Sequence, residues 1–119
     1  PWQTPSAFHG IMNRSDAYLD SIGFSGFTTA MQAIECGLPI VTMEGRFMRG
    51  RLASGILRTL GLDELVVSNE DDYATLAVRL ATDSKYRQLV RERIERSRDS
   101  LYHDDAPVRA LQDFLIQTR

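Results

Sequence analysis

The chain has 119 residues, 43% of them hydrophobic and 25% charged, which is the composition of one small globular domain. A net charge of −2 and the lack of an apolar run of about 18 residues exclude a general attraction to nucleic acid and a membrane-spanning helix. One cysteine excludes an internal disulfide, and His9 and His103 are too far apart to indicate a metal site. The first ten residues lack a signal-peptide pattern, so we expect a cytoplasmic protein without metal, cofactor, nucleic-acid partner or membrane contact.

Apolar spacing and capping residues divide the chain into helices that alternate with strands. Phe8, Ile11 and Met12 are spaced as one face of a first helix, and Ala17 and Leu19 share one face of a first strand. The predicted elements are, in chain order, a helix at 4–14, a strand at 16–22, a helix at 28–36, a strand at 38–43, a helix at 49–60, a strand at 65–68 and helices at 70–81, 84–98 and 106–117.

This alternation predicts an α/β fold with a parallel sheet. The run LPIVTM at 38–43 is apolar throughout, as expected for a strand that is buried on both faces. Three strands make about half of a doubly wound domain. We therefore expect a three-layer, partial Rossmann-like sheet with flanking helices and a helical C-terminal tail. Residues 1–119 are expected to form one domain cut from a longer protein.

The stretch GFSGFTT, at 23–29, joins the first strand to the next helix. In open α/β sheets, ligands bind at this edge, where the N–H groups of a helix start attract anions. Gly26 allows close approach of a ligand, and Thr28 and Thr29 offer hydroxyl donors. The alternative is capping alone, in which Ser25, Thr28 or Thr29 bonds the helix's own N–H groups.

Two further groups of polar residues are expected near the same edge. Gln32 lies one turn after the threonine pair, where it can reach the hydroxyls of a ribose; the alternative is an exposed helix residue. Residues 45–62 contain four arginines and no acidic residue. Arginine suits phosphate binding, and Arg46 and Arg51 are the expected anion ligands; the alternative is a solvated basic surface.

The segment GFTTAMQAIECGLPIVTMEGRFMRGRLASGILRTLGLDELV resembles the donor-binding half of GT-B glycosyltransferases. It is most similar to protein O-GlcNAc transferases and their bacterial relatives, whose catalytic region usually follows tetratricopeptide repeats. The motifs are YLD before the loop, the threonine pair, GLPIVTM with a glycine two residues later, and RLAS. The similarity extends from about Ala7 to Leu101, and the GLPIV segment alone is shared by many GT-B enzymes.

The resemblance implies specific roles in binding a UDP-sugar. The diphosphate site comprises Gly26, Phe27, Thr28, Thr29 and Arg51; Gln32 binds the ribose, and Arg46 is an accessory anion contact. Phe27 stands where the family has a histidine, and Gln32 where it has an acidic residue. The family's candidate catalytic base and its phosphate-binding lysine lie outside the similar segment, so no catalytic residue is expected here and the segment alone is expected to be inactive.

The resemblance implies transfer of a sugar, such as N-acetylglucosamine, to a protein or another hydroxyl acceptor. One alternative is a GT-B transferase that uses a different nucleotide sugar. Another is a degenerate domain that is retained for protein interaction, which Phe27 and Gln32 would favour. A partial parallel sheet also leaves an open strand edge, so we expect self-association through that edge or through the N-terminal helix.

Overall fold

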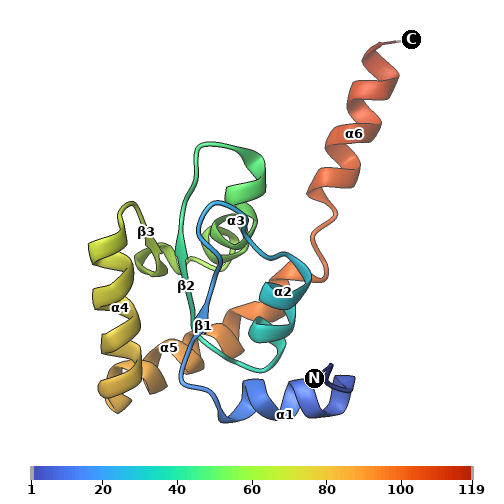
Figure 1. Ribbon diagram of the computed structural model, residues 1–119. Helices are drawn as coiled ribbons and strands as arrows, with labels where there is room; N and C mark the ends of the chain where they lie inside the picture. Colours follow the sequence, from blue (N-terminus) through green and yellow to red (C-terminus); the bar gives the residue numbers. More distant parts are fainter. Residues whose placement is uncertain (1, 119) are drawn as a thin grey trace.

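The computed structural model describes residues 2–118 and contains a parallel three-stranded sheet in the order β1-β2-β3. Tyr18 pairs with Ile40, and Thr42 pairs with Val66. Helices flank both faces of the sheet, which confirms the predicted α/β class (Figure 1). The strands are β1 Tyr18–Leu19, β2 Ile40–Met43 and β3 Val66–Val67, and the helices are α1 Pro5–Arg14, α2 Thr28–Glu35, α3 Leu52–Thr59, α4 Glu70–Thr82, α5 Ser84–Ser97 and α6 Ala106–Gln117, with short 3-10 turns η1 Met48–Gly50, η2 Asp63–Leu65 and η3 Arg98–Leu101.

The helix boundaries follow from local chemistry. The side chains of Thr4, Asn69 and Asp83 each accept a hydrogen bond from the backbone N–H three residues further on, at 3.2, 2.8 and 3.0 Å. Gly37 and Gly61, just beyond α2 and α3, have φ values of 63° and 69°. These left-handed values favour glycine and stop each helix.

The predicted helix at 49–60 is divided in the structure. The 3-10 turn η1 comes first, and Arg51 (φ −130°) separates it from α3. The N–H of Gly45 donates to the carbonyl of Gly50 at 2.9 Å, and a Cβ added at either glycine would lie 3.2 Å from the other's Cα. This tight closure redirects the chain at Arg51, so a continuous helix cannot form.

The core is centred on β2, where Ile40, Val41 and Thr42 are fully buried. Each fully buried aliphatic side chain contributes on the order of 1.5–3 kcal/mol to stability. Helices α2, α3 and α4 all contact β2, in agreement with a central strand that is covered on both faces. The helices supply Ile34, Leu57, Leu80 and Ile94 to this core.

Strand β1 differs from its expected pattern. Leu19 is 54% exposed, whereas the neighbouring Asp20 is only 2% exposed. The face of β1 that is turned toward the core therefore ends with the carboxylate of Asp20. The face that carries Ala17 and Leu19 is not the buried one.

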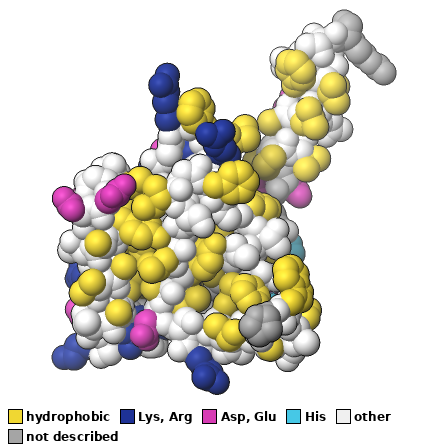
Figure 2. All heavy atoms as spheres, viewed as in Figure 1, with side chains coloured by type: hydrophobic (Ala, Val, Ile, Leu, Met, Phe, Trp, Pro, Cys, Tyr) yellow, Lys and Arg dark blue, Asp and Glu magenta, His cyan; other side chains and the backbone are white. Residues whose placement is uncertain are grey.

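Helix α6 extends away from the sheet and the other helices (Figure 1). None of its residues is buried, and hydrophobic side chains lie along it (Figure 2). The predicted helical tail is thus confirmed. Within residues 2–118, no helix combines the length and the apolar character needed to cross a bilayer.

Candidate functional site

Two loops meet beside the carboxyl ends of the strands. Residues 20–27 join β1 to α2, and residues 44–51 join β2 to α3. The N–H of Ser25 donates to the carbonyl of Arg49 at 2.7 Å, so the two loops are bonded to each other. Both lie at the same end of the sheet, as a ligand site of an α/β fold requires (Figure 1).

Asp20 is the centre of a buried hydrogen-bond network at this edge. Its Oδ2 accepts from the hydroxyls of Ser25 (2.6 Å) and Thr42 (2.7 Å), and its Oδ1 accepts from the N–H of Gly26 (2.8 Å). Sequence reasoning assigned no role to Asp20, because an acidic residue in a short strand does not by itself indicate which groups it contacts. A polar Thr42 inside an otherwise apolar strand was the signal that could have indicated a buried partner.

The Asp20 network reaches two further helices. The Oγ of Ser25 also accepts from the N–H of Ala53 at 2.9 Å, in the first turn of α3. The hydroxyl of Tyr73, on α4, donates to the main-chain carbonyl of Asp20 at 2.7 Å. Burial is the main cause that raises the pKa of Tyr73, so its phenol remains a neutral donor at physiological pH.

The start of α2 has no side-chain cap. Phe27 occupies the N-cap position, and no side chain within residues 2–118 caps the first-turn N–H groups. Ser25 instead bonds Asp20, and the hydroxyl of Thr29 lies 2.9 Å from that of Tyr18. The capping alternative is therefore wrong, and the positive end of α2 is free to receive an anion. Thr28 is exposed at the same place.

Gly26 is required by the packing of the loop. A Cβ at this position would lie 2.5 Å from the Oγ1 of Thr29 and 2.7 Å from the hydroxyl of Tyr18. Both distances are shorter than a real contact allows. The absence of a side chain at Gly26 leaves room for the Tyr18–Thr29 hydrogen bond, and close approach of a ligand to this glycine stays a prediction.

Gln32 and Thr29 line the same hollow, which has a volume of about 460 Å³. Its other walls include the aromatic rings of Trp2 and Phe8, and Gln32 is partly buried. The helical spacing of Thr29 and Gln32 thus places both polar groups beside one apolar cavity. The contacts of these two residues with a diphosphate and a ribose stay predictions.

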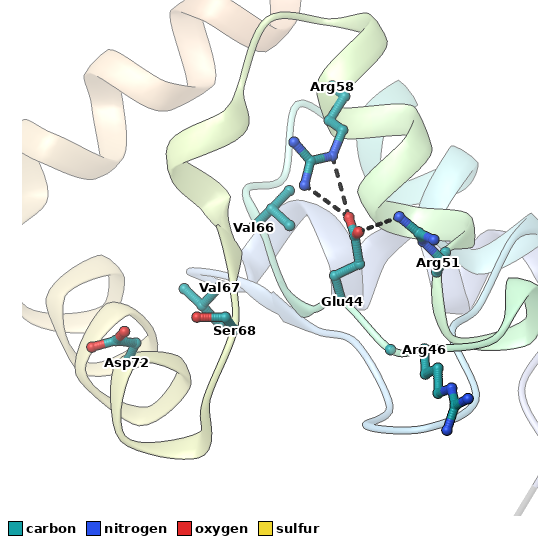
Figure 3. A pocket seen from close by; sticks show the side chains of 9 residues that line it. Glu44, Arg46, Arg51, Arg58, Val66, Val67, Ser68 and Asp72 are labelled. Carbon is teal, nitrogen blue, oxygen red and sulfur yellow. Dashed lines mark hydrogen bonds and ion pairs between the residues drawn. The ribbon is translucent and has the colours of Figure 1, made fainter.

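The arginines after β2 do not form an unpaired cluster. Glu44 accepts from Arg51 at 2.5 Å and from Arg58 at 2.8 Å, and Arg58 also contacts Asp63 at 3.1 Å (Figure 3). This segment contains no acidic residue, but Glu44 and Asp63, which flank it in the sequence, contact its arginines in the folded chain. Two of the four positive charges are therefore compensated inside the molecule.

Arg46 and Arg49 remain outside this ion-pair group. Their guanidinium groups lie 5.7 and 5.3 Å from the ring centroid of the exposed Phe47, which is cation–π distance. Neither forms an ion pair within residues 2–118. Figure 3 shows Arg46 directed away from Glu44, so its charge is available to an anion.

Five of the seven predicted site residues line three separate hollows, and Gly26 and Thr28 line none of them. Arg46 and Arg51 line one of about 610 Å³ that opens beside β3. Arg51 also lines a second, of about 410 Å³, together with Phe27. Thr29 and Gln32 line the third. In the part of the chain that the structure describes, no group of three or more His, Cys, Asp or Glu side chains is placed to hold a metal ion.

The Glu44 ion pairs predict an acid-sensitive contribution to stability. Hydrogen bonding by Arg58 is the main cause that lowers the pKa of Glu44 below its ordinary 4.5. Because the folded-state pKa is the lower one, this contribution is complete above the unfolded-state pKa of about 4.5 and is lost as pH falls from there through the folded-state pKa. We expect Glu44→Gln to make unfolding free energy, measured by urea titration, fall less steeply with decreasing pH in this acid range. Glu95→Gln, at an exposed acid without an ion pair in residues 2–118, should leave the slope unchanged; equal slopes for wild type and Glu44→Gln would contradict the expectation.

Known proteins are similar to this chain in both sequence and structure. The model of the family described as Glycosyl transferase family 41 matches residues 12–106. A plant protein from Eustoma exaltatum subsp. russellianum, "Probable UDP-N-acetylglucosamine--peptide N-acetylglucosaminyltransferase SPINDLY", is 38% identical over 86 residues, which are 69% of this chain and 9% of that protein. The "UDP-N-acetylglucosamine--peptide N-acetylglucosaminyltransferase" of Caenorhabditis elegans is 35% identical over 86 residues, covering 72% of this chain and 8% of that protein.

A solved structure agrees with these sequence matches. A mutant O-GlcNAc transferase from Thermobaculum terrenum superposes with a TM-score of 0.82 at 33% sequence identity. The match covers 97% of this chain and 22% of the solved chain, so this segment spans a small part of its longer relatives. The sheet, its flanking helices and the family match over 12–106 agree, and the chain belongs to glycosyl transferase family 41.

Proposed function

We propose that this segment binds the nucleotide-sugar donor of a glycosyltransferase that transfers N-acetylglucosamine from UDP to a protein hydroxyl. The observation on which this rests is the uncapped start of α2, with Thr28 exposed beside it at the carboxyl edge of the sheet. Relatives whose names specify UDP-N-acetylglucosamine and peptide as substrates support the choice of donor and acceptor.

In the proposed reaction, the acceptor oxygen forms a bond to the anomeric carbon while the bond from that carbon to the diphosphate breaks. The acceptor proton passes to a base outside this segment, and negative charge grows on the departing diphosphate. The N–H groups at the start of α2 and the hydroxyls of Thr28 and Thr29 are placed to stabilise that charge. Arg46 forms no ion pair within residues 2–118, whereas Arg51 shares its charge with Glu44.

Gln32 and Phe27 define what kind of donor contact this chain can make. Gln32 can hydrogen-bond a ribose hydroxyl, but its neutral amide forms a weaker bond than a carboxylate would. Phe27 is 54% exposed and offers only its ring and its backbone to the ligand. A different nucleotide sugar, or a binding role without catalysis, is therefore the alternative that these two residues favour.

The test is calorimetry of the full-length protein with UDP, UDP-N-acetylglucosamine, UDP-glucose and GDP. Binding of UDP and its N-acetylglucosamine conjugate in preference to GDP is expected. Preference for another nucleotide would replace the donor assignment but retain the glycosyltransferase class. No binding of any of the four would leave the interaction-domain alternative and overturn the proposal.

We also propose that transfer requires no metal ion and takes place in the cytoplasm. The diphosphate charge would be balanced by helix-start N–H groups and Arg46, so transfer is expected to continue in EDTA. The described segment has one free cysteine, Cys36, which suits the reducing cytoplasm. Loss of transfer in EDTA, or recovery of the protein only from a secreted fraction, would contradict these two parts of the proposal.

An open strand edge supports a proposal of self-association. In the described sheet, β1 pairs only with β2, and Leu19 on β1 is 54% exposed. Unpaired strand edges favour pairing with another chain. We expect the isolated segment 1–119 to form dimers or larger species in sedimentation velocity experiments, and Leu19→Lys to shift it toward monomer. A wild-type segment that stays monomeric over a wide concentration range would contradict this expectation.

A further inference from the structure

We propose that Asp20 is a positioning residue of the donor site: its buried carboxylate holds the loop that leads into α2 and thereby sets where Thr28 and Thr29 present their hydroxyls. The inference rests on the proposed function, since it concerns the site at which the diphosphate would bind. Asp20 itself is 2% exposed and cannot touch the ligand directly.

Both carboxylate oxygens of Asp20 are engaged by the loop. The N–H of Gly26 donates to Oδ1 at 2.8 Å, and the hydroxyl of Ser25 donates to Oδ2 at 2.6 Å. The hydroxyl of Thr42 on β2 also donates to Oδ2, at 2.7 Å. One side chain thus ties the loop to the central strand.

No arginine or lysine within residues 2–118 forms an ion pair with Asp20. Its charge is instead met by two hydroxyls and one backbone N–H, and hydrogen bonds to a charged acceptor are short and strong. Oδ1 has one of these donors and Oδ2 has two, so loss of any donor leaves the buried carboxylate with fewer hydrogen bonds, which is costly. The network therefore has a well-defined geometry.

The same network orients two helix starts. Gly26 lies two residues before Thr28, so its bond to Asp20 fixes the entry of the chain into α2. Ser25 bonds Asp20 and also accepts from the N–H of Ala53 in α3 at 2.9 Å. A ligand site gains accuracy when residues behind it are locked in this way. The placement of the network at the ligand edge, rather than in the middle of the sheet, favours positioning over core stability alone.

The first experiment needs no ligand. Amide hydrogen exchange is measured on the full-length protein for wild type, Asp20→Asn and Ser54→Ala. Ser54 is equally buried, and its hydroxyl donates to the carbonyl of Arg51 at 2.9 Å, outside the Asp20 network. We expect exchange of the hydrogen-bonded amides of Ser25, Gly26 and Met31 to accelerate on the order of tenfold in Asp20→Asn and not in Ser54→Ala. Unchanged exchange of these three amides in Asp20→Asn would overturn the inference.

The second experiment compares UDP with uridine by calorimetry on the same proteins. A displaced threonine hydroxyl would lose its hydrogen bond to a charged phosphate, so Asp20→Asn is expected to bind UDP about tenfold more weakly or worse. Uridine, which lacks the diphosphate, should bind as it does to wild type. Equal loss for UDP and uridine would indicate general destabilisation and overturn the positioning role.

A milder variant covers the case in which Asp20→Asn does not fold. Thr42→Val keeps the side-chain shape and removes one of the three donors to the carboxylate. It should give the same changes at smaller amplitude, and their absence would overturn the inference. If wild type binds neither UDP nor uridine, the proposed function fails, while the exchange result still decides whether Asp20 positions the loop.

Discussion

Replacing Thr28 and Thr29 together by valine in the full-length protein is expected to weaken UDP binding by about tenfold or more for each hydroxyl that contacts phosphate. A hydrogen bond to a charged group contributes about 1.5–3 kcal/mol, and valine has the shape of threonine without the donor. Both residues lie in the first turn of α2, where no side chain caps the helix. The measurement is titration calorimetry of UDP with each single variant and with the pair.

Two control variants separate this effect from indirect ones. Thr82→Val removes a hydroxyl at the end of α4, where it bonds only the carbonyl of Val78 at 2.8 Å, and should leave UDP affinity unchanged. Tyr18→Phe removes the partner of Thr29 without altering either threonine. If the double valine variant keeps the wild-type affinity, the threonine pair does not bind phosphate, and the start of α2 is not the diphosphate site.

Gly26→Ala is expected to lower the unfolding free energy by about 1–3 kcal/mol, the usual effect of an added methyl group in a packed position. The new Cβ would lie 2.5 Å from the Oγ1 of Thr29 and 2.7 Å from the hydroxyl of Tyr18, so one of these groups must move. Rotation of the Thr29 hydroxyl would break its bond to Tyr18 and turn it away from its present direction. We therefore expect weaker UDP binding together with the lower stability. Urea unfolding and calorimetry measure the two effects.

Gly55→Ala is the matched control within the same chain. Gly55 lies in α3 with no heavy atom within 4 Å of an added Cβ. Alanine there should raise stability by about 0.5–1 kcal/mol, because alanine favours a helix more than glycine does. Equal stability for the two alanine variants would show that the contacts around Gly26 are not restrictive.

The local pattern of residues predicted most of the fold. The apolar run at 38–43 indicated the buried central strand, and Gly37 and Gly61 indicated where α2 and α3 end. These features act over a few neighbouring residues, so they are legible without the rest of the chain. The break at Arg51 was missed, because it depends on contact between Gly45 and Gly50 across the loop.

The family resemblance selected Thr28, Thr29, Gln32 and Arg51 from among many polar residues. The structure places the first three along one helix, as their spacing predicted. For Arg51 the sequence showed a charge but not its partner, since Glu44 is seven residues away and meets it only when the loop closes. Their roles in binding remain predictions that the calorimetric experiments test.

Local residue patterns were sufficient for the order of helices and strands, the parallel class of the sheet and the place of the candidate site at its edge, because periodicity, caps and glycine turns are local properties. The burial of Asp20, its bond to Ser25 in place of an α2 cap, and the contact of Thr42 from another strand depend on the folded chain. The partners of the Asp20 carboxylate lie up to 22 residues away in the chain, and Tyr73, which bonds its main-chain carbonyl, lies 53 residues away. A carboxylate is buried only where such distant donors converge, and folding alone brings them together.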